Sequence, residues 1–236
     1  MCAGVSLRRW RLALALACCV AGADACAQAS GSMSVVSDYY YRGVGYSKGD
    51  PVPQFNLSFD TRSGWYAGMF ASMLKMSGTS RGLYAIGYAG YARRMAAGGS
   101  WEAGGTNHTF STMSALNYRE VYVGLGSDRL SGRVSYSPGY MGTAMRTVYS
   151  EVNGGLALSD DVGLFARVGY LRAVSAVPRY TSGTRLDGRI GIGVSIEAWK
   201  LQAAWDALHA EQGTYARTGG SIRSRNGLVL TVTRSF

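Results

Sequence analysis

The sequence predicts an all-β protein, an antiparallel up-and-down transmembrane β-barrel of twelve strands, with eight or ten strands as the alternative counts. Three observations lead to this fold class. Charged residues make up only 16% of the 236 residues, against about 25% in an average soluble domain. Apolar and polar residues alternate over long stretches, the period-two pattern of strands whose two faces meet different surroundings. Glycine (33 residues) and tyrosine (16 residues) are abundant, whereas proline, which strands tolerate poorly, occurs 4 times.

The first 27 residues are expected to form a cleaved secretory signal peptide. Basic residues near the start are followed by an apolar stretch over 12–22, which has the length of a signal-peptide core and is too short to span a bilayer. The small residues Ala25 and Ala27 fit a cleavage site. We therefore expect export through the Sec pathway and a barrel domain over 28–236. An uncleaved anchor, or a lipoprotein attached through Cys19, is the alternative.

The cysteines support the same division of the chain. Cys2, Cys18, Cys19 and Cys26 all lie within the predicted signal peptide. The mature chain is therefore expected to hold no disulfide and no zinc site of the cysteine type. Its Gly-x-Gly sequences do not open a helix, so they predict no dinucleotide site. We expect no cofactor and no metal.

Twelve segments alternate as strands do. In the clearest one, over 184–197, the isoleucines share one face while Asp187 and Arg189 share the other. Most segments have about 10 residues or more, the length that a tilted strand needs to cross a bilayer. The predicted strands cover 33–47, 52–61, 64–76, 83–95, 98–112, 118–127, 129–139, 145–158, 162–173, 184–197, 199–209 and 226–236.

Two features bear on the strand count and the topology. The segment over 98–112 is the weakest, because Asn107 and Thr109 would fall on its outer face. Connections alternate between short turns, such as 61–64, and longer loops, of which 210–225 is the longest. Outer-membrane barrels show this alternation between periplasmic turns and extracellular loops, so the pattern favours an up-and-down barrel.

A soluble β-sandwich could bury the same apolar faces, but the last strand favours a barrel in lipid. Leu228, Leu230, Val232 and Phe236 share a face, although Arg234 stands where an apolar residue is more usual. The barrel-assembly machinery recognises a terminal aromatic residue on such a strand as an insertion signal. We therefore expect Phe236 to be the membrane-insertion signal of a closed barrel, which leaves no bare strand edge in lipid.

The alternation divides the side chains into an outward and an inward set. A charge on the lipid face costs about 2–4 kcal/mol at the bilayer midplane, so charged residues are expected inside. The predicted outward residues are Tyr39, Tyr41, Phe55, Leu57, Val121, Val123, Val134, Val148, Val152, Val168, Ile190, Ile192, Trp199 and Trp205. The predicted lumen-lining residues are Asp38, Arg42, Asp60, Glu102, Glu120, Arg133, Glu151, Arg167, Asp187, Arg189, Lys200 and Asp206. Trp65, Tyr170 and Trp199 are expected in the aromatic girdles at the membrane interfaces.

The first two predicted strands carry motifs of a known family. These motifs are Ser37-Asp38-Tyr39, Arg42-Gly43, Gly49-Asp50-Pro51 and Ser63-Gly64-Trp65-Tyr66-Ala67-Gly68, with weaker matches at Tyr88-Ala89-Gly90-Tyr91 and Arg234-Ser235-Phe236. They resemble the TorF-type porin family, a conserved hypothetical family of exported bacterial barrels. Gly87 departs from that pattern, because the family tends to place an acidic residue there. The resemblance implies an outer-membrane pore without naming its solute.

These observations predict a porin-like channel for passive diffusion of small hydrophilic solutes across the bacterial outer membrane. The chain carries a net charge of +10, of which +2 lies in the predicted signal peptide, so the mature chain keeps +8. This excess suggests a mild preference for anions and contact with outer-membrane lipid and lipopolysaccharide. It does not suggest nucleic acid, because the mature chain has no long lysine or arginine run. Inward glycines such as Gly124 and Gly191 favour space inside the barrel.

The main alternative is a plugged or gated barrel in which arginine–carboxylate pairs brace a filled interior. Twelve strands lie between barrels with filled interiors and barrels with open channels, so the count leaves both readings open. An outer-membrane enzyme acting on lipid is a third reading. The chain has only two histidines, His108 and His209, and no Gly-x-Ser-x-Gly sequence. We therefore expect no enzyme and no catalytic residue.

Overall fold

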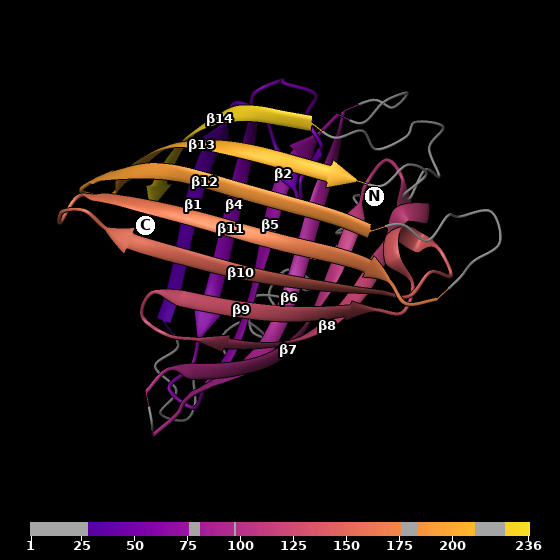
Figure 1. Ribbon diagram of the computed structural model, residues 1–236, viewed down its shortest axis with the longest axis horizontal. Helices are drawn as coiled ribbons and strands as arrows, with labels where there is room; N and C mark the ends of the chain where they lie inside the picture. Colours follow the sequence, from indigo (N-terminus) through magenta and orange to yellow (C-terminus); the bar gives the residue numbers. More distant parts are fainter. Residues whose placement is uncertain (1–27, 76–80, 97, 176–183, 211–224) are drawn as a thin grey trace, which may run out of the picture.

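A computed structural model describes residues 28–75, 81–96, 98–175, 184–210 and 225–236, so the predicted signal peptide lies outside the described residues. Twelve antiparallel strands close into one barrel (Figure 1), which confirms the predicted fold class and strand count. The barrel strands are β1 (Gln28–Val36), β4 (Val52–Asp60), β5 (Trp65–Leu74), β6 (Gly82–Arg94), β7 (Ser100–Phe110), β8 (Tyr118–Gly126), β9 (Leu130–Ser137), β10 (Thr147–Ala157), β11 (Val162–Ala173), β12 (Thr184–Ile196), β13 (Trp199–Ala210) and β14 (Arg225–Ser235).

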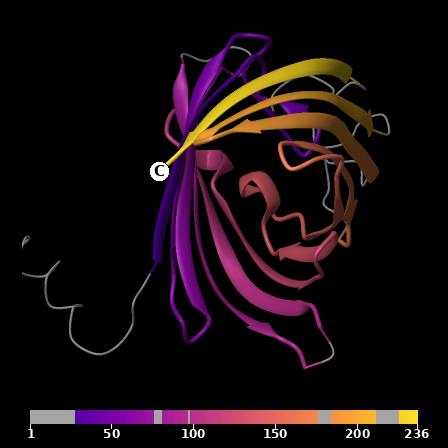
Figure 2. The same ribbon diagram turned by 90° about the vertical axis from the view of Figure 1, so that its left-hand side faces the viewer.

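The barrel closes where its first and last strands pair. Each barrel strand pairs with its neighbour in sequence, and β1 pairs with both β4 and β14. Beyond the ladder, the backbone amides of Gly31 and Phe236 each donate to the other's carbonyl oxygen over 3.0 Å. Figure 2 shows the strands encircling one interior. Closure leaves no strand edge in this wall without a partner, as a barrel in lipid requires.

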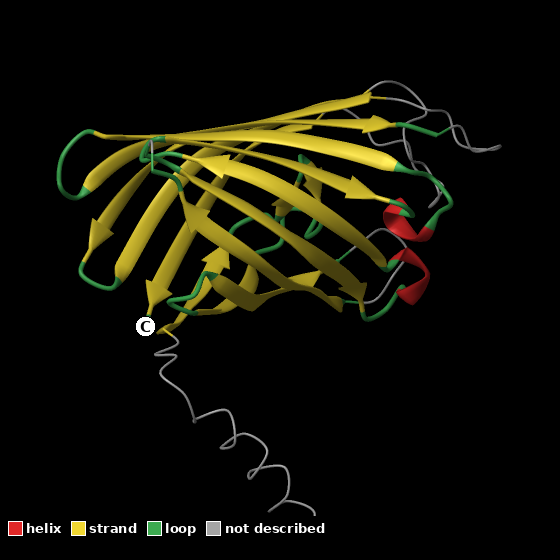
Figure 3. Cartoon of the chain, turned by 90° about the horizontal axis from the view of Figure 1, so that it is seen from below, coloured by secondary structure: helices red, strands yellow, loops and turns green. Residues whose placement is uncertain are grey.

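The two ends of the barrel differ. We call the end that holds the C-terminus and the short turns, such as 61–64 and 197–198, the turn end. The loop end is the opposite end, where the short 3-10 helices η1 (Ser114–Leu116) and η2 (Tyr140–Gly142) lie (Figure 3). Within the described residues, no helix is long and apolar enough to cross a membrane.

The exterior of the barrel is apolar. On β8, Val121, Val123 and Leu125 are 60%, 61% and 63% exposed. Ile190 on β12 and Leu228 on β14 are exposed to a similar degree. Monomeric soluble domains rarely expose so continuous an apolar surface, whereas the surface of a barrel that faces lipid must be apolar.

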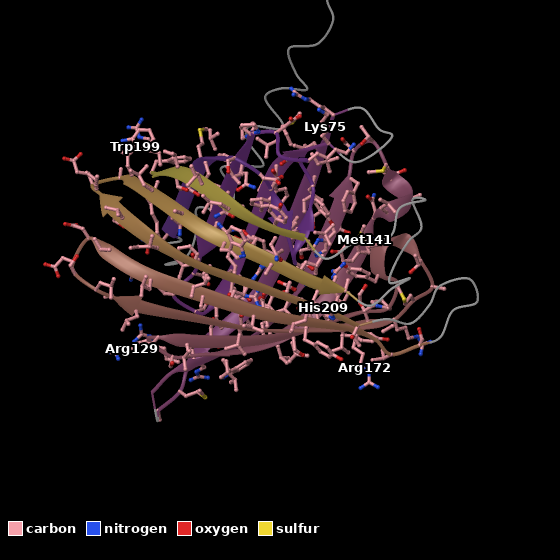
Figure 4. All side chains as sticks on the ribbon, turned by 45° about the horizontal axis from the view of Figure 1, so that its top comes forward. Lys75, Arg129, Met141, Arg172, Trp199 and His209 are labelled. Carbon is pink, nitrogen blue, oxygen red and sulfur yellow. The ribbon has the colours of Figure 1, made fainter. Side chains whose placement is uncertain are left out.

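Aromatic residues lie near both ends of this surface. Trp65 and Trp199 are exposed at the turn end, where Figure 4 labels Trp199, and Tyr170 is exposed toward the loop end. These are the positions at which girdle residues meet the membrane interfaces.

The prediction of the first strand is wrong after residue 36. The sequence predicts one strand over 33–47, but the barrel strand β1 ends at Val36. Residues 37–49 then turn into the interior, where β2 (Tyr40–Tyr41) and β3 (Val44–Gly45) form a small hairpin. Tyr39 and Tyr41, predicted to face lipid, therefore lie inside the barrel, where Tyr39 belongs to the apolar core and the half-buried Tyr41 packs against it. The alternation in this segment is real, but it is that of a hairpin enclosed by the wall.

The weakest predicted strand is confirmed. Residues predicted at 98–112 form β7, which pairs along its length with β6 and β8. Asn107 is exposed on its outer face and accepts a hydrogen bond from Arg119 Nε over 3.3 Å. Neighbouring side chains thus partly satisfy the polar groups that weakened the prediction.

The face assignment can be tested with one arginine placed on either side of the wall. Val123→Arg should lower the free energy of unfolding by about 2–4 kcal/mol, because the charge would lie in lipid. Gln202→Arg on the inward face of β13 should cost much less, since its charge can reach water inside the barrel. Urea unfolding of the protein refolded into vesicles measures both values, and equal losses would contradict the assignment.

Candidate functional site

The hairpin formed by residues 37–49, which we call the plug hairpin, occupies the barrel interior at the loop end. Its tip is the pair Arg42 and Gly43, with φ angles of 50° and 75°. Two successive positive φ angles make the two-residue turn whose twist matches a β-hairpin. A Cβ added to Gly43 would lie 2.8 Å from both Asp187 Cβ and Leu208 Cδ1. The tip is therefore seated against the barrel wall so closely that only glycine fits.

Hydrogen bonds hold the base of the plug hairpin together. Ser47 Oγ donates to Asp38 Oδ1 over 2.7 Å and accepts from the amide of Tyr39 over 2.8 Å. The amide of Lys75, at the end of β5, donates to the carbonyl of Tyr46 over 2.7 Å. These bonds fix the shape of the segment and tie it to the wall.

A salt bridge joins the chain just after the plug hairpin to the end of β5. Lys75 Nζ lies 2.7 Å from Asp50 Oδ2. The hydrogen bond from Lys75 and its positive charge lower the pKa of the exposed Asp50 carboxyl below its ordinary value. Because the pair is exposed, it contributes little to stability, and the anchoring of the plug hairpin depends on the buried contacts.

Aromatic rings fill the interior around the plug hairpin. Tyr46 packs against Tyr39 and Tyr84 with ring centroids 5.7 and 5.4 Å apart, and Tyr84 lies 4.7 Å from Phe110. All four rings are buried. Such pairs add about 0.5–1.5 kcal/mol each beyond the area that they bury. The apolar core of this protein thus lies inside the loop end of the barrel.

One buried ion pair connects the tip of the plug hairpin to the wall. Arg42 Nη1 and Nη2 donate to Glu120 Oε1 and Oε2 on β8, both over 2.7 Å. The two side chains are 7% and 3% exposed. The guanidinium also lies 3.9 Å from the centre of the Tyr149 ring on β10. A two-pronged pair of this kind is the strongest form of side-chain hydrogen bonding.

His108 supports this pair from β7. Its Nδ1 lies 2.7 Å from the Tyr84 hydroxyl and its Nε2 lies 2.9 Å from Thr106 Oγ1. The imidazole stacks on Tyr118 at 4.1 Å, and Nε2 is 3.6 Å from Glu120 Oε2. Both ring nitrogens thus have hydrogen-bond partners, so this histidine acts as a structural residue in the described state.

Below the tip of the plug hairpin, toward the turn end, lies a cavity of about 360 Å³. Tyr41 and Arg42 line this cavity on the side of the plug hairpin. Its walls carry the charged residues Glu120, Arg133, Glu151 and Arg167 together with the tyrosines Tyr88 and Tyr122. We call this space the chamber. It has the size and polarity to hold water or a small hydrophilic solute.

Three arginines on the inner wall, Arg133, Arg167 and Arg189, are paired with carboxylates. Arg133 lies 2.7 Å from Glu102. Arg167 lies 3.0 Å from Asp187, and Arg189 lies 3.2 Å from Asp206. Together with Arg42 and Glu120, these pairs distribute alternating charges of both signs around the interior. Such an interior solvates ions without presenting a strong net field of either sign.

Inward glycines provide room for these side chains rather than for an open channel. Gly124 on β8 lies between Glu102 and Arg133, and a Cβ there would be 2.7 Å from Glu102 Oε1. A Cβ on Gly104 would lie 2.6 Å from the Tyr122 hydroxyl, and one on Gly191 would lie 2.5 Å from the Phe165 ring. At these three positions the space that glycine leaves is occupied by rings or a carboxylate.

The whole length of this barrel matches one family model, described as "Bacterial protein of unknown function (Gcw_chp)", over residues 20–236. The chain belongs to the Gcw_chp family. The match does not test the finer TorF-type resemblance, which stays a prediction. No curated protein matches the chain in sequence.

Solved structures share the fold of this Gcw_chp protein. A KdgM porin aligns with a TM-score of 0.55 at 12% identity, covering 88% of this chain and 98% of the porin. A NanC porin aligns with a TM-score of 0.57 at 12% identity, covering 86% of this chain and 98% of the porin. At this identity the likeness shows the architecture of the barrel.

The predicted lumen-lining residues occupy three places in this Gcw_chp barrel. Asp38 and Arg42 belong to the plug hairpin and not to a strand of the wall. Asp60 and Lys200 lie exposed near the turn end. The others line the inner wall: Glu102, Glu120, Arg133, Glu151, Arg167, Asp187, Arg189 and Asp206. Their role in conduction is a prediction that the geometry alone does not test.

Sequence reasoning missed two residues of the site. Arg185 on β12 is buried and donates to the Tyr140 hydroxyl over 2.9 Å. It shares the face of Asp187, so the same alternation could have found it. Tyr149 packs on Arg42, a contact between distant segments that no local pattern signals. Within the described residues, no group of three histidine, cysteine or acidic side chains could hold a metal ion.

Removing the carboxylate that holds Arg42 should release the plug hairpin. Glu120→Gln leaves a buried charge without its partner, which costs about 3–5 kcal/mol. Trypsin should then cut after Arg42 at least about tenfold faster, since each 1.4 kcal/mol changes an equilibrium tenfold. Mass spectrometry of timed digests of the refolded protein measures the rate.

Glu102→Gln is the matched control, because it removes the partner of Arg133 at a site away from the plug hairpin. It should leave cleavage after Arg42 unchanged. Equal cleavage rates in the two variants would show that Glu120 does not hold the plug hairpin.

Proposed function

We propose that this protein is an outer-membrane porin-like channel for passive diffusion of small hydrophilic solutes, closed at rest by the plug hairpin. The observation that carries the proposal is the combination of an apolar exterior with a charged, partly hollow interior. A closed barrel needs an apolar exterior to insert in lipid, but insertion alone does not require a chamber lined by paired charges. The fold shared with the KdgM and NanC porins supports the same proposal.

The ends of the barrel suggest its orientation. Both described termini lie at the turn end, and bacterial barrels place short turns in the periplasm and longer loops outside. We therefore propose that the turn end faces the periplasm and the loop end faces the medium. This orientation agrees with export of 28–236 through the Sec pathway after removal of the predicted signal peptide, and with Phe236 as the signal read by the barrel-assembly machinery.

We base the proposed mild anion preference on the charges at the loop end of the barrel and not on the charges of the chamber. Inside, Arg42, Arg133, Arg167 and Arg189 each have a carboxylate partner, which largely cancels the charge of these four arginines. At the loop end the exposed charges are mostly basic, and they include Lys48 and Arg81. Like-signed charges at a pore mouth raise the local concentration of counter-ions. We therefore expect a small preference for anions.

A permanently plugged barrel is the second candidate, and the buried Arg42–Glu120 pair favours it. Removal of two charges from water is costly, so such a pair is retained where it holds a defined arrangement or serves as a switch. A plug that never moves and a plug that opens share this geometry in the closed state. They differ in whether weakening the pair creates a conducting path.

Planar-bilayer recording separates the two candidates. Wild-type protein should give brief or rare conductance steps, and Glu120→Gln should give longer openings with a larger mean current. Graded polyethylene glycols then bound the radius of the opening, and reversal potentials in a salt gradient should show weak anion selectivity. Silence of both proteins at every voltage and salt concentration would establish the permanently plugged barrel, and clear cation selectivity would contradict the proposed preference.

A further inference from the structure

The outer surface at the loop end carries a group of arginines that the proposed channel does not use. Arg119 is the second residue of β8, beside the inward Glu120, and Arg172 is the last but one of β11, on the outward face that also carries Val168 and Tyr170. Arg146 stands directly before β10, between the buried Met145 and Thr147. All three arginines are exposed, and Figure 4 shows Arg172 pointing away from the barrel at the loop end.

The strand register brings these arginines to neighbouring places. Arg172 lies opposite Val148, and the amide of Val174 donates to the carbonyl of Arg146 over 2.9 Å. Arg146 and Arg172 are therefore diagonal neighbours on adjacent strands, about 7–8 Å apart. Arg119 lies two strands away, about 10 Å around the wall. Tyr136 on β9 pairs with Val121 and Val148, so it occupies the outward position one step nearer the turn end, diagonal to Arg119 and Arg146.

This surface holds positive charge without compensating carboxylates. In the part of the chain that the structure describes, no aspartate or glutamate occupies an outward position on a barrel strand. Among the same residues, none of the three arginines forms an ion pair, and Arg119 donates to Asn107 alone. Guanidinium groups left unpaired beside an apolar surface are suited to an anion presented by that surface.

The turn end differs in this respect. Its exposed basic residues, such as Arg62, Arg93, Arg129 and Arg234, stand among acidic ones. Those acidic residues are Asp128, Asp160, Asp161 and Glu197, which occupy the turns. A general need for charges at the membrane boundary would give both ends the same mixture. At the loop end, among the described residues, Asp50 pairs with Lys75 and Arg81 and forms no ion pair with the three arginines, so this group holds positive charge alone.

We propose that Arg119, Arg146 and Arg172 form a binding site for the phosphate groups of lipopolysaccharide in the outer leaflet. The inference rests on the orientation given under the proposed function, but not on conduction. Guanidinium groups bind phosphate through two parallel hydrogen bonds. Tyr136 and Tyr170 would meet the glycolipid at the boundary between headgroup and acyl chains, where tyrosine is favoured. The site would fix the depth and rotation of the barrel in that leaflet.

The test measures binding of bisphosphorylated lipid A to the protein refolded in detergent. Arg146→Gln/Arg172→Gln removes two members of the site, and Arg93→Gln/Arg234→Gln removes two outward arginines at the turn end with the same change in net charge. The first variant should bind lipid A at least about tenfold more weakly than wild type, a loss of about 1.4 kcal/mol. The second should bind like wild type.

Two further probes identify the ligand chemistry. Lipid A treated with phosphatase should bind wild type as weakly as intact lipid A binds the Arg146→Gln/Arg172→Gln variant. Inorganic phosphate should not displace lipid A at millimolar concentration, because the site needs the lipid surface as well as the anion. Equal binding by the two double variants, or undiminished binding of the dephosphorylated lipid, would overturn the proposal.

Conductance of the same variants keeps this test separate from the proposed function. Heat-modifiable migration on gels shows whether each variant folds. A folded Arg146→Gln/Arg172→Gln protein should give wild-type conductance while it loses lipid A. Lipid A binding by a protein that never conducts would overturn the channel and leave the lipid site in place.

Discussion

The buried pair of Arg42 and Glu120 is the interaction on which the interior of this protein depends. It connects the tip of the plug hairpin to β8 across 78 residues of sequence, in a place where an unpaired charge would be costly. The pair explains why a turn with a positive φ at a non-glycine residue is stable here, since Arg42 adopts φ 50° at some cost in local conformation. Tyr149 against the guanidinium and His108 beside the carboxylate complete the surroundings of the pair. Without it, the tip of the plug hairpin would lose its ion pair with the barrel wall.

The small width of the barrel determines how the rest of the interior is packed. Twelve strands lie between barrels with filled interiors and barrels with open channels, and here tyrosines, arginines and carboxylates project into the interior. The wall makes room with glycines on neighbouring strands, as Gly124 does for Glu102 and Gly104 does for Tyr122. The loop end is therefore packed like a protein core, and the chamber is the part in which charged side chains keep water. Such a division suits a channel whose closed state is well ordered and whose open state requires a segment to move.

The sequence predicts the wall of the barrel better than its contents. Alternation over β8 and over β10 to β13 identifies outward residues such as Val123 and Ile190, because one face meets lipid and the other does not. It fails at Tyr39 and Tyr41, since a hairpin inside the barrel has the same period as a strand of the wall. What distinguishes the two is the turn at Arg42 and Gly43 and its contact with Glu120, which depends on long-range packing. The doubtful segment over 98–112 is a true strand for a related reason: Asn107 finds a partner in Arg119 on the next strand.

The central claim is that conduction requires the plug hairpin to leave its place, and a reversible lock tests it most directly. Arg42 and Glu120 join the tip of the plug hairpin to β8, so Arg42→Cys/Glu120→Cys removes the ion pair and places two thiols that a short bifunctional thiol reagent can link through disulfides. All native cysteines lie in residues 1–27, so the link in 28–236 is unique. Our account predicts that the unlinked double variant opens as Glu120→Gln does, that the linked protein is silent in a planar bilayer, and that a reductant restores the openings. Undiminished current through a protein whose cross-link is verified by mass spectrometry would contradict it.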